Sequence, residues 1–231
     1  MSRDDQKREA ARAAIALVQD GMVVGLGTGS TAAFAIEALA ERVRGGLRIV
    51  GVPTSERSAA QARGLGIPLT TLEEHHRIDL TIDGADEIAR GSLELVKGLG
   101  GALLREKIVA AASDRLVIVA DAAKLVGRLG TGVPVPVEVV PFGWQTTAER
   151  LARLGANPVL RRDDAGQPFR TDGGHLILDC GFGVIADPAD LEQALSRVVG
   201  VVECGLFIGM ADLALVASDH GVQRLARERR G

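Results

Sequence analysis

The chain has 231 residues, of which 46% are hydrophobic and 25% charged, a composition typical of a folded globular protein. Its 27 basic and 30 acidic residues give a formal net charge of −3, and it holds five Phe, one Trp and no Tyr. Nucleic-acid binding is therefore not expected, because it uses basic patches and aromatic stacking platforms. No apolar run approaches the length that crosses a membrane, so we expect a cytoplasmic protein without a membrane partner.

The first half of the chain alternates helical patterns with short apolar runs. Helices are predicted at 4–19, 30–44, 55–66 and 101–112. Strands are predicted at 22–26, 47–53, 78–83, 92–97 and 115–121. Apolar strands separated by helices are typical of a parallel sheet covered on both faces, so we expect a doubly wound, Rossmann-like α/β domain.

From about residue 131 the order of elements changes. Strands are predicted at 134–141, 158–163, 175–180 and 200–205, and helices at 142–155 and 187–198. This β-α-β-β-α-β order matches the ferredoxin-like unit. We therefore expect a small α+β domain at 131–204, inserted into a catalytic domain made of 1–130 and 205–231. A strand at 212–218 would return to the main sheet, and the basic segment 224–231 is predicted to be a solvated helix.

The stretch GLGTGST (25–31) places three glycines between the first strand and the next helix. It is not a dinucleotide fingerprint, because Ser30 stands where the third glycine would be, and it has no Walker A lysine. Glycines allow close backbone approach, and a helix start offers free N–H groups to an anion, so the turn is a candidate phosphate site. Thr28, Ser30 and Thr31 add hydroxyl groups. The alternative is an ordinary turn in which Ser30 or Thr31 caps the helix.

The stretch TIDGADEI (81–88) follows an apolar strand directly with Asp83, Asp86 and Glu87. Three carboxylates next to an anion site repel one another and the ligand, so they need a function. Binding of sugar hydroxyls is favoured over a magnesium site, because no second acidic cluster accompanies them. The alternative is an Asp/Gly-rich turn.

The stretch LVKGLGGALLREKIVAA (95–111) joins a predicted strand to an apolar helix. Glu106 projects among apolar neighbours at helical spacing, and desolvation raises a carboxyl pKa toward the range of a general base. An ion pair with a distant cation explains Glu106 equally well. Lys97, at the strand end, either faces the aspartates or lies at the surface, and its place before the glycine turn favours the first.

Two further lysines are candidate phosphate partners. Lys124 follows the strand at 115–121, and Lys7 lies on the first helix, where sequence alone does not separate it from an exposed lysine. The four histidines have no metal-ligand spacing, and Cys180 and Cys204 form no zinc or disulfide pattern.

Five ordered blocks, GLGTGST, TSERS, DGADE, KGLGGALLREK and VADAAK, resemble ribose-5-phosphate isomerase of the A type. The resemblance continues through VPVEVVPFGW, RTDGGHLILDC and GVVECGLF, so it covers nearly the whole chain. It implies interconversion of ribose 5-phosphate and ribulose 5-phosphate through an enediolate, in the non-oxidative pentose phosphate pathway, without a metal or organic cofactor. It also implies a homo-oligomer, expected to be a homodimer.

By matching motifs, the resemblance assigns catalytic roles to Glu106 as base, Lys97 as oxyanion partner, and Asp83 and Asp86 in ring opening. It implies that the substrate is contacted by Thr28, Gly29, Ser30, Thr31, Asp83, Gly84, Ala85, Asp86, Lys97, Gly98, Leu99, Gly100 and Lys124. Leu99 departs from the family's run of three glycines, and its contacts depend on a negative φ and an outward side chain. Two alternatives remain open: another phosphosugar reaction such as amino-sugar phosphate deamination, and a non-catalytic phosphosugar sensor.

Overall fold

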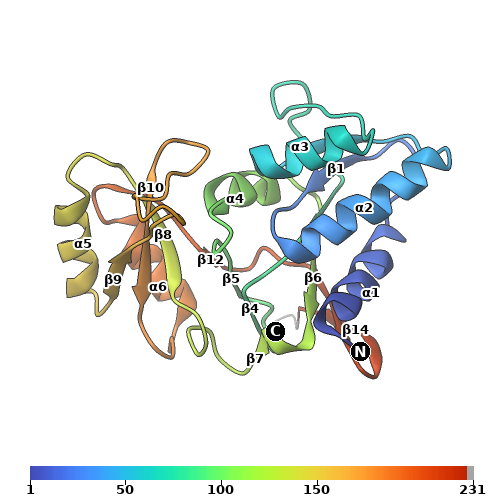
Figure 1. The fold of residues 1–231 in the computed structure, drawn as a ribbon. Coiled ribbons are helices and arrows are strands. Elements are labelled where there is room, and N and C mark those ends of the chain that lie inside the picture. Colours follow the sequence, from blue (N-terminus) through green and yellow to red (C-terminus); the bar gives the residue numbers. More distant parts are fainter. Residues whose placement is uncertain (228–231) are drawn as a thin grey trace.

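The computed structural model describes residues 1–227, which form three sheets (Figure 1). A six-stranded main sheet and a four-stranded small sheet lie at opposite ends of the molecule, and a second four-stranded sheet lies between them. The mixed α/β fold with a mostly parallel main sheet confirms the predicted fold class.

The main sheet has the order β14-β13-β6-β3-β1-β2, and all its pairs are parallel except β13 with β14. Its strands are β1 (Val23–Leu26), β2 (Val50–Pro53), β3 (Leu80–Asp83), β6 (Leu116–Asp121), β13 (Leu213–Ser218) and β14 (Gly221–Ala226). The predicted return of the chain at 212–218 is confirmed, because β13 pairs with β6.

Helices cover both faces of the main sheet, as the apolar strands predict. One face carries α1 (Arg3–Ile15), α2 (Ser30–Arg44) and α3 (Glu56–Gly64), whose apolar sides share a core with β1, β3 and β6. The other face carries α4 (Leu103–Ala111), which buries Val109 against β2 and Ala110 beside β6. A Ser2 capping box starts α1, and Ser55 starts α3 in the same way.

The middle sheet corrects one prediction. It has the order β12-β5-β4-β7, with strands β4 (Glu87–Ala89), β5 (Leu95–Val96), β7 (Leu125–Val126) and β12 (Leu206–Phe207). The strand predicted at 92–97 is therefore short, lies outside the main sheet and runs antiparallel to β4. Only five residues join β4 to β5, and so short a connection forces a hairpin, since parallel strands need a long crossover.

The middle sheet also joins distant parts of the chain. Lys97, directly after β5, donates its backbone N–H to the carbonyl of Gly205, directly before β12, at 2.8 Å. A β-carbon on Gly205 would lie 2.1 Å from the Lys97 carbonyl oxygen, so only glycine fits at this junction. Phe207 is fully buried in this region.

The small sheet follows the predicted β-α-β-β-α-β order and has the antiparallel arrangement β11-β8-β10-β9. Its elements are β8 (Val135–Val139), α5 (Trp144–Arg153), β9 (Asn157–Leu160), β10 (Leu176–Gly181), α6 (Pro188–Ser196) and β11 (Val201–Cys204). Asp187 caps α6 through two backbone N–H groups, with Pro188 in the first turn.

The helix predicted at 224–231 is wrong where the structure describes it. Residues up to Ala226 belong to β14, an exposed edge strand, and residues 228–231 lie outside the described part. Edge strands carry charged residues, so their composition resembles that of a solvated helix. Within residues 1–227, no helix combines the length and apolar character that a membrane span requires.

Candidate active site

The predicted site residues gather around one cavity of about 80 Å³. It lies where the carboxyl ends of β1 and β3 meet the turn after β5 and the start of α4, as expected for a parallel sheet. The lining residues are Thr28, Gly29, Ser30, Thr31, Gly84, Ala85, Asp86, Lys97, Gly98, Gly100, Glu106 and Lys124.

The glycine turn leaves the start of α2 open to an anion. Gly29 is the N-cap residue with φ 111°, and no side chain caps the helix or adds an acidic group to its first turn. Within residues 1–227, the N–H groups of Ser30 and Thr31 thus have no protein acceptor and lie at the positive end of the helix dipole. The alternative in which Ser30 or Thr31 is the N-cap is wrong.

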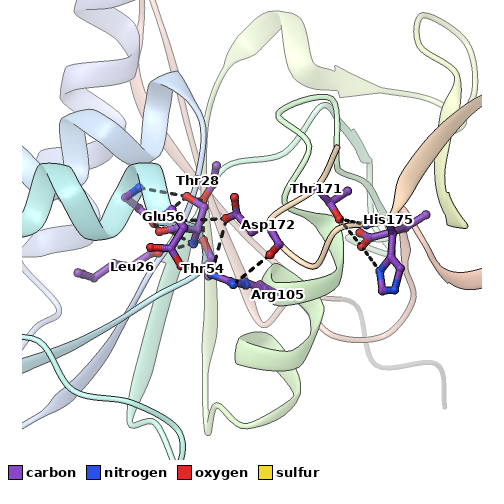
Figure 2. A network of polar contacts seen from close by, with 11 residues as sticks. Leu26, Thr28, Thr54, Glu56, Arg105, Thr171, Asp172 and His175 are labelled. Atoms are coloured by element: carbon purple, nitrogen blue, oxygen red, sulfur yellow. Dashed lines mark hydrogen bonds and ion pairs between the residues drawn. The ribbon is translucent and has the colours of Figure 1, made fainter. Parts of the chain in front are cut away.

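Thr28 fixes the turn through hydrogen bonds to neighbouring residues. Its backbone N–H donates to Asp83 at 3.0 Å. Its buried hydroxyl lies 2.7 Å from the hydroxyls of both Thr54 and Ser55, and Figure 2 shows Thr28 beside Thr54. Thr54 in turn donates to the carbonyl of Leu26. The Thr28 hydroxyl is therefore occupied by protein, and the exposed Ser30 is the better placed hydroxyl donor.

Three charged groups lie buried beneath the cavity. The Lys97 ammonium lies 3.1 Å from Asp83 Oδ2 and 3.4 Å from Glu106 Oε1, and all three side chains are at most 5% exposed. Lys97 thus faces the aspartate, as the sequence favours, and the cation that pairs with Glu106 is Lys97. Glu106 Oε2 is buried and has no hydrogen-bond partner within residues 1–227.

The surroundings give these groups different proton affinities. Burial above all, together with the Asp83 charge, raises the pKa of Glu106 to about 8 against the opposing effect of Lys97. Burial would lower the pKa of Lys97, but the neighbouring carboxylates outweigh it and raise the pKa. Burial raises the pKa of Asp83 as well, although Lys97 and two backbone N–H donors favour its ionised form. Asp83 thus has more donors that favour its ionised form than Glu106, whose Oε2 accepts no hydrogen bond within residues 1–227.

The turn after Lys97 accommodates its departure from glycine. Leu99 does not have a positive φ, and its half-exposed side chain lies outside the cavity lining. Its N–H donates to Asp86 Oδ2 at 2.9 Å. The positive φ values fall on Gly98 and Gly101. Leu99 therefore supports Asp86 and leaves the cavity to its glycine neighbours.

Of the other predicted site residues, some line the cavity and some do not. Lys124, in a short 3₁₀ turn after β6, lines the cavity. Asp83 is buried below the cavity. Lys7 is not among the lining residues, and its ammonium pairs with Asp4 at 3.1 Å. Within residues 1–227, no group of three or more His, Cys, Asp or Glu side chains is arranged to hold a metal ion.

Sequence reasoning missed the supporting residues. Thr54 follows β2 directly, and the rule that parallel strand ends meet at one edge could have placed it beside Thr28. Arg161, which follows β9, donates to the carbonyls of Gly98 and Leu99 at 2.9 and 3.1 Å. It comes from the small sheet, and no local pattern signals such a contact.

Comparison with known proteins identifies the relatives of this chain. Residues 50–221 match the family model described as ribose 5-phosphate isomerase A (phosphoriboisomerase A). Ribose-5-phosphate isomerase A of Gloeobacter violaceus is 65% identical over 225 residues, 97% of each chain.

Two solved structures share the fold over almost their full length. Ribose 5-phosphate isomerase A from Methanocaldococcus jannaschii has a TM-score of 0.94 at 40% identity, covering 98% of this chain and 100% of its own. A D-ribose-5-phosphate isomerase in complex with phospho-erythronic acid has a TM-score of 0.95 at 39% identity, with the same coverage. The chain belongs to the ribose-5-phosphate isomerase A family.

Proposed function

We propose that the buried cluster of Lys97, Asp83 and Glu106 carries out the isomerisation of ribose 5-phosphate to ribulose 5-phosphate, the reaction named by the family to which this chain belongs. The observation that carries the proposal is the free Oε2 of Glu106, which is buried at the cavity wall with a pKa raised to about 8. A carboxyl group near neutral pKa that has an unoccupied oxygen is suited to both accept and return a proton.

Glu106 removes the proton from C2 of the open-chain aldose and delivers it to C1. The electron pair of the C2–H bond forms the enediolate, and negative charge moves to the O1 oxygen. Lys97 and the backbone N–H donors of the turn that follows it stabilise this charge. The 2-hydroxyl proton is transferred to O1 as the ketone forms. Preorganised donors in a buried site stabilise such developing charge more strongly than water does.

Asp86 binds the sugar hydroxyls and assists ring opening, and Asp83 assists it indirectly. Asp86 lines the cavity, whereas Asp83 acts from below through Lys97 and the backbone of Thr28. The phosphate lies at the start of α2, contacted by Ser30 and Thr31, with Lys124 as its cation. Lys7 is the outermost candidate and would have to leave Asp4 to take part. The relative solved with phospho-erythronic acid supports a phosphorylated ligand.

Replacing Glu106 by Gln tests the base. Glu106→Gln keeps the side-chain shape but cannot accept the proton, so turnover of ribose 5-phosphate should fall by about 10²-fold or more while the thermal unfolding midpoint is kept. Glu149→Gln, an exposed glutamate on α5, is the matched control and should be fully active.

Full activity of Glu106→Gln would remove Glu106 from the mechanism. The proposed reaction takes no metal or organic cofactor, so EDTA should leave the rate unchanged. Coupled assays on amino-sugar phosphates separate the isomerase from a deaminase. Binding of the phosphosugar without turnover by the wild-type chain would instead identify a sensor.

The chain is further proposed to form a homodimer. Support comes from three exposed apolar side chains at one end of the small sheet, Val140, Phe142 and Val199, on segments joined by the Val140 N–H to Gly200 carbonyl bond. Light scattering in solution should give twice the 24.1 kDa mass of the chain. A mass of one chain at micromolar concentration would refute it.

A cytoplasmic location and a two-domain division complete the proposal. The free thiols of Cys180 and Cys204 support a reducing compartment. The four strands of the small sheet all fall within 131–204, which supports that range as the second domain, with 1–130 and 205–231 as the catalytic domain.

A further inference from the structure

Arg161 connects the small sheet to the turn at residues 98–101, which follows Lys97. Its Nη1 donates to the carbonyl oxygens of Gly98 and Leu99, while Nε and Nη2 form a fork on the carboxylate of Asp179, the Nε bond being 2.9 Å. The side chain is 12% exposed, and its guanidinium lies 5.9 Å from the centre of the Phe169 ring. Asp179, on β10 of the small sheet, thus fixes the orientation of the guanidinium, and Nη1 remains to contact the turn.

Phe169 contacts the same turn from beside Arg161. A β-carbon on Gly101 would lie 2.4 Å from the Phe169 ring, so the ring packs directly against this glycine. Gly101 closes the turn by donating its N–H to the Gly98 carbonyl at 3.0 Å. The connection between β9 and β10 therefore contacts both the first and the last residue of the turn.

The contacts of Arg161 fix the direction of two peptide groups. In a trans peptide, the carbonyl of one residue and the N–H of the next point to opposite sides. The Gly98 carbonyl faces Arg161, and the Leu99 N–H accordingly donates to Asp86. The Leu99 carbonyl also faces Arg161, so the Gly100 N–H points away from it. Gly100 lines the cavity, and its N–H has no protein acceptor within residues 1–227.

We propose that Arg161 is a positioning residue for the isomerase reaction. By holding the Gly98 and Leu99 carbonyls, it aims the Gly100 N–H at the substrate oxygen that becomes negative and keeps Asp86 in place through Leu99. The inference rests on the proposed function, since it assigns this turn to the enediolate. An arginine is required because a lysine has its three donors on a single nitrogen, which cannot form the fork on Asp179 and at the same time extend to the two carbonyls as the separate guanidinium nitrogens do.

The test compares Arg161→Ala and Arg161→Lys with Arg162→Ala. Arg162 is the adjacent exposed arginine and donates only within its own hairpin, to the Gly166 carbonyl, so it controls for lost charge. Initial rates on ribose 5-phosphate are measured well below each variant's unfolding midpoint. Arg161→Ala should lower kcat about 10-fold or more and change KM by less than about threefold, because misaligned donors cost transition-state stabilisation.

Arg161→Lys should recover only a small part of that loss, and Arg162→Ala should match the wild type. A kcat of Arg161→Ala within about twofold of wild type, or a change confined to KM, overturns the inference. If Arg161→Ala does not fold, the double variant Arg161→Ala/Asp179→Asn removes the carboxylate left unpaired and is assayed in its place. Inactivity of both the wild type and Arg162→Ala would overturn the proposed function itself.

Discussion

At the scale of single residues, the site depends on a buried cluster whose charges do not cancel. Two carboxyl groups face one ammonium with almost no access to water, so ionising both leaves a net negative charge at low dielectric. Asp83 accepts backbone N–H donors from Thr28 and Gly84, whereas Glu106 Oε2 accepts none. Of the two carboxyl groups, Glu106 therefore has the oxygen that no protein donor occupies within residues 1–227.

The raised pKa of Glu106 predicts an unusual acid limb in the pH profile. A base must be ionised to accept a proton, so kcat/KM for ribose 5-phosphate should rise with pH through an apparent pKa of about 8. An acid limb near pH 4.5, the ordinary value for Glu, would contradict the assignment.

The same group affects folding stability with the opposite sign. Between pH 4.5 and about 8, native Glu106 keeps a proton that the unfolded chain has lost, so the free energy of unfolding falls as pH rises. Denaturant titrations at pH 5 and pH 8 should show this decline in the wild type and a smaller one in Glu106→Gln. An equal decline in both would place the proton on another group.

At the scale of elements, the β1–α2 turn can approach β3 closely because Gly27 has no side chain. A β-carbon on Gly27 would lie 2.2 Å from Asp83 Oδ1 and 2.6 Å from the Asp83 Cα. The turn therefore packs with its backbone directly against Asp83 at the end of β3, and the Thr28 N–H donates to Asp83 at this contact. The glycines of GLGTGST serve this approach as well as the anion site.

Gly27→Ala should therefore damage both stability and activity. The methyl group must displace Asp83, which costs about 1–3 kcal/mol of unfolding free energy and disturbs the partner of Lys97. Gly64→Ala is the control, because a β-carbon there meets nothing within 4 Å and its φ is not positive. The control should be neutral or slightly stabilising. Urea denaturation and initial rates measure both effects, and an unperturbed Gly27→Ala would refute the contact.

At the scale of the whole molecule, the middle sheet connects the two ends. It pairs β5 with β12, which lie before and after the small sheet in the chain, and Phe207 packs between two buried ammonium groups. The Phe207 ring centre lies 5.4 Å from Lys97 Nζ and 5.1 Å from Lys107 Nζ. Lys107 also reaches across to Glu203 on β11 at 2.7 Å. The active-site lysine thus belongs to a core shared by both ends.

Such a shared core predicts cooperative unfolding. The single tryptophan, Trp144, reports on the small sheet, and far-ultraviolet circular dichroism reports on the whole chain. The two transitions should coincide, and Phe207→Ala should shift both together by about 3–5 kcal/mol. Earlier loss of the Trp144 signal would mean that the small sheet unfolds by itself.

Periodicity was sufficient to predict the long elements, including α2, α3 and the β-α-β-β-α-β order of the small sheet. It failed for β4, β7 and β12, because two or three residues carry no period. It also failed for β14, whose exposed, charged sequence is that of an edge strand. For the site, strand ends and spacing led to Lys97 and Glu106, whereas Arg161 acts across more than 60 residues of sequence, beyond any local pattern.

The junction at Gly205 limits how relatives of this chain can vary in length. The tip of the hairpin around Gly166 is exposed, so insertions there cost little. At Gly205 the chain forms a backbone hydrogen bond with Lys97 and has no space for a single side-chain atom. Lengthening or shortening the chain at that point would move Lys97, so the segment that carries the small sheet can vary in length at the Gly166 hairpin but not at Gly205.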